Sequence, residues 1–252
     1  MDYVVCVVAV APVRKESSHR SEIMTEMLLG EFAWVLEETK DFSKVKSVYD
    51  GYEGWCQKSQ LEKVTEMIDT KTFLIDAVGE IEVNDQPCRI SCATPIFENE
   101  MISFGRFQLN YKNSKAGNAS TAAFSESNIR SIAFKFLNTP YLWGGKSVFG
   151  IDCSGFSQQV FKLVNIKLER DAYQQAEQGE VVGFLQEAKC GDLAFFDNEE
   201  GRIVHVGILL DTETIIHASG KVRVDKIDNA GIINSDTGER THRLRIIKRY
   251  CQ

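Results

Sequence analysis

One stretch decides the fold: PYLWGGKSVFGIDCSGF, residues 140–156. A glycine-rich loop leads to Cys153, and the residues after it predict a helix over 153–164. N–H groups at a helix start stabilise an anion, which would lower the thiol's pKa and favour the nucleophilic thiolate. The same N–H groups could hold an oxyanion. Cys153 is therefore a candidate nucleophile. Taken alone, however, the loop and helix favour a buried structural thiol beside the capping residue Asp152.

Two of the four histidines fall on neighbouring predicted strands. His205 lies in the strand 203–210 and His217 in the strand 214–218. A short turn makes the two strands antiparallel, and a suitable register would bring the imidazoles together. His205 would then take the thiol proton, and His217 would orient the ring of His205. The rival for these residues is a zinc site with Cys153, which lacks a fourth ligand.

The rest of the chain predicts an α+β protein in three domains. Domain 119–252 has a first helix capped by Ser127, the helix after Cys153, and then strands at 193–196, 203–210, 214–218, 222–227 and 244–249. Before it, two sets of short strands predict two small SH3-like β-barrels, 1–64 and 65–118. The strands are expected at 4–10, 32–37, 44–49, 54–57, 72–78, 81–83, 89–93 and 101–109. A helical turn is expected at 21–29, a hairpin turn at Asp50-Gly51, a connector at 61–67 and a polar linker at 111–121.

The composition and the apolar pattern argue against nucleic acid as a partner and against a membrane span. The chain has 252 residues, 43% hydrophobic and 26% charged, with a net charge of −7. An acidic chain without a basic block gains nothing from phosphate neutralisation, so nucleic acid is not expected. The apolar run 3–13 is too short to span a bilayer. Residues 9–11 resemble a signal-peptidase site, but Asp2 stands where a signal needs positive charge. A cytoplasmic protein is expected, with a secreted or periplasmic one as the alternative.

The seven cysteines favour reduced thiols. Their number is odd and their spacing irregular, which is not typical of a disulfide framework. Cys88 and Cys92 could form half a metal site, but two strand residues on one face are the simpler interpretation. No metal and no cofactor is expected.

In combination, PYLWGG, DCSGF, GDLAFF, HVGI and IHAS resemble the NlpC/P60 family of papain-like cysteine peptidases, over residues 125–252. The resemblance implies Cys153 as nucleophile, His205 as base and His217 as third polar residue. It also implies oxyanion or substrate contacts by Tyr141, Trp143, Asp152 and Ser154. Arg170-Asp171 matches the family's RD stretch, whose next residue can be Ser and is Ala172 here.

The N-terminal part resembles bacterial SH3 (SH3b) domains, through VAPVR at 10–14, LGE at 29–31 and DGYEGW at 50–55. Tandem SH3b domains before this catalytic domain are similar to the γ-D-glutamyl-L-diamino acid endopeptidases of murein recycling. That similarity implies cleavage between D-Glu and diaminopimelate or Lys in peptides with a free N-terminal L-Ala. It also implies that the first SH3b domain binds the amine through Tyr52 and either Glu22 or Glu53. The alternative for the glutamates is a solvated surface charge.

Three functions remain open at this point. The first is a peptidase for recycled murein peptides. The second is a hydrolase of intact peptidoglycan that uses the SH3b domains as wall anchors, against which the acidic composition and the weak signal segment argue. The third is a peptide-binding module without activity, against which the intact set of Cys153, His205 and His217 argues.

Overall fold

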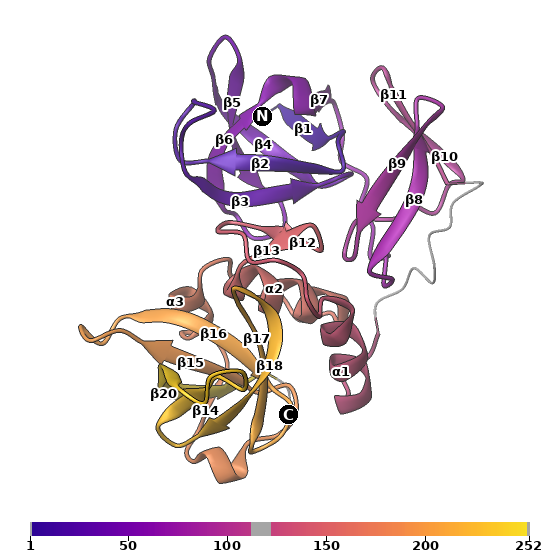
Figure 1. Cartoon of the computed structure of the whole chain (residues 1–252). Helices are drawn as coiled ribbons and strands as arrows, with labels where there is room; N and C mark the ends of the chain where they lie inside the picture. Colours follow the sequence, from indigo (N-terminus) through magenta and orange to yellow (C-terminus); the bar gives the residue numbers. More distant parts are fainter. Residues whose placement is uncertain (1, 112–121, 251–252) are drawn as a thin grey trace. The chain divides into compact units, whose positions relative to one another are not determined.

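The computed structural model describes residues 2–111 and 122–250, which belong to two compact units (Figure 1). The first unit consists of Met1–Thr121 and Trp143–Gly150, and the second of Ala122–Leu142 and Ile151–Gln252. The segment Trp143–Gly150 therefore belongs to the N-terminal unit, although the chain reaches it after entering the C-terminal one. Most of the expected linker lies outside the described residues, as does the end of the expected domain 65–118.

A seven-stranded antiparallel sheet opens the first unit, in the order β3-β2-β6-β5-β4-β1-β7. In β2 and β6 buried residues alternate with less buried ones, as the pleat of a strand requires. Buried side chains of the sheet form a core that includes Val4, Val13 and Val45. The turn at Asp50-Gly51 is confirmed, with Gly51 at a φ of +75° that other residues rarely adopt. The strands are β1 (Tyr3–Cys6), β2 (Val10–Arg14), β3 (Ile23–Leu28), β4 (Phe32–Glu38), β5 (Phe42–Ser47), β6 (Glu53–Gln57) and β7 (Leu61–Val64).

Three expectations for this sheet are wrong. The residues 21–29 form no helical turn; β3 pairs antiparallel with β2 instead. The single strand expected at 4–10 is broken into β1 and β2. The connector expected at 61–67 begins as β7, which pairs with β1. For β3 and β7, pairing with another strand overrides the local pattern.

The second sheet of this unit has four strands in the order β10-β11-β8-β9: β8 (Val78–Val83), β9 (Gln86–Ser91), β10 (Met101–Phe104) and β11 (Phe107–Asn110). Its core includes Leu74, Ile90 and Leu109 and is shared with Val5 and Leu29 of the first sheet. The strand expected at 101–109 is a hairpin turning at Gly105. Within 72–78 only an isolated bridge from Phe73 to Pro95 forms before β8 begins. The domain boundary at 64/65 stays a prediction.

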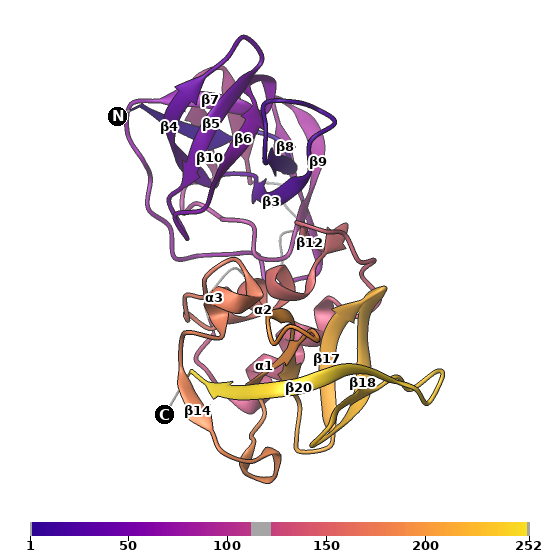
Figure 2. The same cartoon turned by 90° about the vertical axis from the view of Figure 1, so that its left-hand side faces the viewer.

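The second unit joins helices to a closed sheet (Figure 2). Strand order is β14-β20-β15-β16-β17-β18-β19, and β19 also pairs with β20, so six of the strands form a barrel. The helices are α1 (Glu126–Lys135), α2 (Cys153–Leu163) and α3 (Ala172–Gln175); the strands are β14 (Glu180–Val182), β15 (Leu193–Asp197), β16 (Ile203–Leu209), β17 (Thr214–Ser219), β18 (Lys221–Asp228), β19 (Gly231–Ile233) and β20 (Arg240–Arg249). The strands β12 (Lys146–Ser147) and β13 (Gly150–Ile151) form a separate two-stranded sheet.

The helix expected after Cys153 is confirmed as α2, which packs against β16 and β17. The expected cap of the first helix is wrong: Ser125, not Ser127, accepts the hydrogen bond from the N–H of Asn128. Across residues 2–111 and 122–250, no helix has both the length and the apolar character that a membrane span needs.

Candidate active site

Cys153 is the first residue of α2 and only 7% exposed. The preceding residue, Asp152, is extended and caps the helix, since its Oδ1 accepts the N–H of Gly155 at 2.6 Å. An N-cap carboxylate satisfies a helix donor that would otherwise lack a partner. The glycine-rich loop thus delivers the thiol to a helix start, as the sequence predicted.

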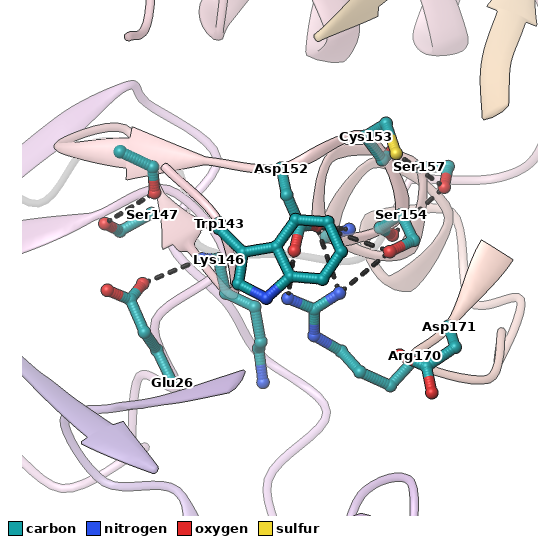
Figure 3. A network of polar contacts seen from close by, with 12 residues as sticks. Glu26, Trp143, Lys146, Ser147, Asp152, Cys153, Ser154, Ser157, Arg170 and Asp171 are labelled. Atoms are coloured by element: carbon teal, nitrogen blue, oxygen red, sulfur yellow. Dashed lines mark hydrogen bonds and ion pairs between the residues drawn. The ribbon is translucent and has the colours of Figure 1, made fainter. Parts of the chain in front are cut away.

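Arg170 binds the side chains of Asp152 and Ser154 at this helix start (Figure 3). Its guanidinium donates to both carboxylate oxygens of Asp152, at 3.0 and 2.7 Å, and to Oγ of Ser154 at 2.9 Å. Arg170 is only 1% exposed, so the ion pair is buried. Asp152 and Ser154 flank the nucleophile as expected, but their polar groups bind Arg170. Their part in substrate binding stays a prediction.

Arg170→Met should destabilise the protein by about 3–5 kcal/mol, because it leaves the carboxylate of Asp152 buried without its counter-charge. Urea unfolding followed by circular dichroism measures the effect. Arg240→Met is the matched control, since Arg240 pairs with the partly exposed Asp228 and should leave the unfolding midpoint close to that of wild type. Equal midpoints for the Arg170 variant and wild type would show that the buried pair does not hold the helix start.

The resting thiol is neutral. Burial raises the pKa of Cys153 to about 12, and the negative charge of Asp152 acts in the same direction. Hydrogen bonds from the backbone N–H groups of Val206 and Ser154 and the charge of Arg170 lower it, but by less. The expectation that the helix start lowers this pKa is therefore wrong for the free protein, because desolvation outweighs the helix N–H groups. Ionisation of Cys153 requires a base.

The two histidines are hydrogen-bonded to each other, as the sequence predicted. His205 Nε2 lies 2.8 Å from His217 Nδ1. In the register of β16 and β17, Gly207 stands opposite His217, and a Cβ on Gly207 would come within 2.8 Å of the Cβ of His217. Because Gly207 has no side chain, the imidazole of His217 has room to reach His205, which lies two residues before Gly207 on the neighbouring strand. Burial, followed by the neighbouring His217 and His242, holds the pKa of His205 well below its ordinary value, so the ring is neutral.

Two further residues of this cluster were not predicted. His217 Nε2 lies 3.0 Å from Oδ2 of Asp225 on β18. His242 on β20 stacks on His205, with ring centroids 4.1 Å apart and an interplanar angle of 27°. Burial and the neighbouring His217 lower the pKa of His242 to about 4. The tight turn at Gly220 makes β17 and β18 a hairpin, so the sequence near His217 could have indicated that Asp225 lies on the neighbouring strand. No feature of the polar sequence around His242 indicated its position.

Tyr141 is held close to the nucleophile by its backbone. Its N–H donates to the carbonyl of Gly220 at 3.0 Å, and it forms a parallel bridge with Ile151. Burial raises the pKa of Tyr141, and the neighbouring Cys153 raises it further. The phenol therefore keeps its proton and can donate a hydrogen bond near the sulfur.

The remaining candidates lie in the first unit. Trp143, 59% exposed, donates from Nε1 to Oε1 of Glu22 at 2.9 Å. Lys15 lies 3.9 Å from the same carboxylate. Glu53 instead lies 3.6 Å from both Lys44 and Lys46.

Tyr52 lines a cavity of about 10 Å³, room for about one water molecule. Glu26 and Lys146 line the same cavity, and the backbone N–H of Lys146 donates to Oε2 of Glu26 at 2.7 Å (Figure 3). The structure thus brings Glu22 and Trp143 together, while Glu53 has separate partners.

Cys88 is half-buried and lies in β9, and Cys92, which directly follows β9, is fully buried. Among the residues that the structure describes, no three His, Cys, Asp or Glu side chains are grouped so that they could hold a metal ion.

Comparisons with known proteins match both units. The family model "NlpC/P60 family" matches residues 138–241, and the model "Bacterial dipeptidyl-peptidase Sh3 domain" matches residues 13–61. Over 221 residues the chain is 33% identical to the γ-D-glutamyl-L-lysine dipeptidyl-peptidase of Bacillus subtilis (strain 168), covering 78% of this chain and 72% of the relative. It is 27% identical over 250 residues to dipeptidyl-peptidase 6 of Lysinibacillus sphaericus, covering 84% and 87%.

Solved structures share the fold. The crystal structure of an NlpC/P60 family protein from Bacillus cereus ATCC 10987 matches with a TM-score of 0.78, covering 98% of this chain and 99% of that one at 19% identity. An NlpC/P60 endopeptidase from Photobacterium damselae subsp. piscicida matches with a TM-score of 0.73 at 16% identity, covering 97% and 70%.

Proposed function

Because the chain belongs to the NlpC/P60 family of cysteine peptidases, we propose that it cleaves the bond between γ-D-Glu and an L-diamino acid in murein peptides with a free N-terminal L-Ala. The diamino acid is diaminopimelate or Lys, and the proposed role is recycling of these peptides in the cytoplasm. The observation that carries the proposal is the buried, hydrogen-bonded pair of His205 and His217, with the buried thiol of Cys153 at the N–H of Val206, the residue after His205. The chain is also similar over most of its length to a γ-D-glutamyl-L-lysine dipeptidyl-peptidase. The same similarity implies a peptidoglycan-derived peptide as substrate.

In the proposed reaction, thiol and imidazole are both neutral at rest. As the sulfur of Cys153 attacks the γ-carbonyl carbon, His205 accepts the thiol proton. The bound carbonyl becomes an oxyanion, stabilised by helix-start N–H groups and the protonated phenol of Tyr141. The imidazolium of His205 then donates its proton to the leaving amine of the diamino acid. Water attacks the resulting thioester, with His205 again as base, and releases L-Ala-γ-D-Glu and the thiol.

We propose Tyr52 and Glu22 as the residues that recognise the free amine. An ammonium group needs a carboxylate whose charge is not already offset. Two lysines neutralise Glu53, whereas Glu22 has the Trp143 N–H and one lysine at the limit of an ion pair. The local contacts therefore support Glu22 over Glu53.

N-acetylation of the L-Ala should reduce kcat/KM by about 10²-fold or more, because it removes the charge that pairs with the carboxylate. The measurement compares L-Ala-γ-D-Glu-diaminopimelate and its Lys analogue with their N-acetyl derivatives. Glu22→Gln and Tyr52→Phe should erode the discrimination between free and capped peptides. Glu53→Gln is the matched control and should leave it unchanged.

Equal turnover of free and capped peptides, or release of fragments from intact sacculi, would contradict the proposal and support a wall hydrolase. Binding of the free peptide without turnover would support the peptide-binding module.

A further inference from the structure

We infer that Asp225 is a positioning residue of this active site, whose carboxylate sets the tautomers of His217 and His205 so that Nδ1 of His205 is the free base. The inference rests on the proposed peptidase reaction but concerns a residue outside the Cys153, His205 and His217 set. It follows from the order of donors and acceptors along one hydrogen-bonded chain.

Asp225 is held as a carboxylate. It is 2% exposed, its Oδ1 accepts the N–H of Ser235 at 2.8 Å and Nη2 of Arg223 at 2.9 Å, and its Oδ2 faces His217. Burial alone raises the pKa of Asp225, but the hydrogen bonds from His217, Ser235 and Arg223 outweigh it and hold the pKa well below its usual range. An ionised carboxylate only accepts hydrogen bonds.

The direction of every bond in the chain follows from that carboxylate. Because Oδ2 of Asp225 can only accept, His217 must carry a proton on Nε2, at 3.0 Å. A neutral His217 then has a lone pair on Nδ1, which accepts from Nε2–H of His205 at 2.8 Å. A neutral His205 with its proton on Nε2 leaves Nδ1 unprotonated. That nitrogen is the base which the proposed reaction requires.

In the opposite tautomer, Nδ1 of His205 would carry the proton and could not accept the proton of the thiol. If His205 carried its proton on Nδ1, its Nε2 would accept from His217 Nδ1–H. A neutral His217 would then turn the lone pair of Nε2 toward the carboxylate of Asp225, and two acceptors would face each other across 3.0 Å. The carboxylate thus selects the productive tautomer, and it also stabilises the positive charge that His205 gains when it takes the thiol proton.

Charged and titratable groups surround the chain on each neighbouring strand. Arg223 on β18 also binds Asp236, at 2.9 Å, and Oδ1 of Asn234, at 3.0 Å. On β20, His242 stacks on His205, and its pKa of about 4 keeps it neutral near pH 7. On α2, the thiol of Cys153 is neutral. None of these groups supplies a second carboxylate to His217, so the selection depends on Asp225.

Asp225→Asn tests the inference because the surroundings fix which way the amide points. Its carbonyl oxygen should take the place of Oδ1, which accepts two hydrogen bonds, from the N–H of Ser235 and from Nη2 of Arg223. Its NH₂ group then takes the place of Oδ2, which faces Nε2 of His217 and also lies 2.8 Å from Nε of Arg223. That donor forces the proton of His217 to Nδ1 and the proton of His205 to Nδ1 as well. Arg223 keeps Asp236 and Asn234 as partners, which favours a folded variant.

The first measurement is ¹⁵N NMR of the imidazole nitrogens near pH 7. In the wild-type protein, His205 should be protonated on Nε2 and unprotonated on Nδ1; in Asp225→Asn the assignment should reverse. A His205 protonated on Nδ1 in the wild-type protein would overturn the inference even if the variant does not fold. This measurement needs no substrate, so it fails or succeeds independently of the proposed function.

The second measurement is the pH dependence of Cys153 alkylation by iodoacetamide, together with kcat and KM on the tripeptide. Asp225→Asn should lower kcat by about 10²- to 10⁴-fold at pH 7 with little change in KM. The variant should also be alkylated more slowly than wild type near pH 7. This difference in rate should shrink as the pH approaches the pKa of the thiol, where the thiolate forms without a base. An alkylation rate lower than wild type by the same factor at all pH values, or a kcat within threefold of wild type, would overturn the inference. Asp228→Asn on the same strand, whose aspartate pairs with Arg240, is the matched control and should match wild type.

Discussion

Cys153→Ala is expected to lower kcat by at least about 10³-fold while the protein still folds, because in the proposed reaction the thiol at the start of α2 forms the acyl-enzyme. The side chain is buried, but the lost sulfur atom should cost only about 1 kcal/mol of folding free energy. Circular dichroism and thermal unfolding check the fold, and release of L-Ala-γ-D-Glu checks turnover.

Cys190→Ala is the matched control for this substitution. Cys190 is a half-buried free thiol in the same unit, and its pKa is raised to about 11, mainly by burial. Its removal should leave kcat unchanged. Turnover above a tenth of wild type in Cys153→Ala would show that the reaction does not pass through this sulfur.

His205→Ala is expected to lower kcat/KM by about 10²- to 10⁴-fold near pH 7, because it removes the group that accepts the thiol proton in the proposed reaction. His217→Asn should be milder, because an amide can still make one of the two hydrogen bonds that orient His205. The same substrates and assay apply to both variants. If His217→Asn were the more damaging change, the roles of the two histidines would have to be exchanged.

The pH dependence of Cys153 alkylation, measured without substrate, distinguishes a neutral thiol and imidazole at rest from a thiolate–imidazolium ion pair. A thiolate–imidazolium pair would give alkylation of Cys153 a plateau at acid pH. Here burial raises the pKa of Cys153 to about 12 and lowers that of His205, so both groups are neutral at rest. The wild-type alkylation rate should therefore rise with pH without an acid plateau. In His205→Ala the rate near pH 7 should fall.

The positions of Cys153 at a helix start and of His205 beside His217 could be predicted because their signals are local. A glycine-rich loop, a capping aspartate and an apolar helix face all lie within a few residues of Cys153. His205 and His217 lie on strands separated by a short turn, so pairing between them has few alternatives. Local turn chemistry likewise predicted Gly51 in the hairpin of β5 and β6.

Several errors fell where pairing with a neighbouring strand or the exact end of a helix decides the outcome. Residues 23–28 have a pattern that also suits a helical turn, but hydrogen bonding to β2 makes them the strand β3. The strand expected at 101–109 folds back on itself at Gly105. Even the cap of α1 lies two residues earlier than expected, because Ser125 and not Ser127 faces the free N–H groups of the helix.

The sequence by itself determined that Cys153 begins a helix and that His205 and His217 lie on neighbouring antiparallel strands, because both features depend on contacts between residues close in the chain. Only the tertiary structure decided which groups surround them. Closure of the barrel brings His242 onto His205, and the register of β18 puts Asp225 behind His217. Burial by the whole unit makes the thiol and the imidazole neutral, since desolvation depends on every residue that excludes water and on no motif.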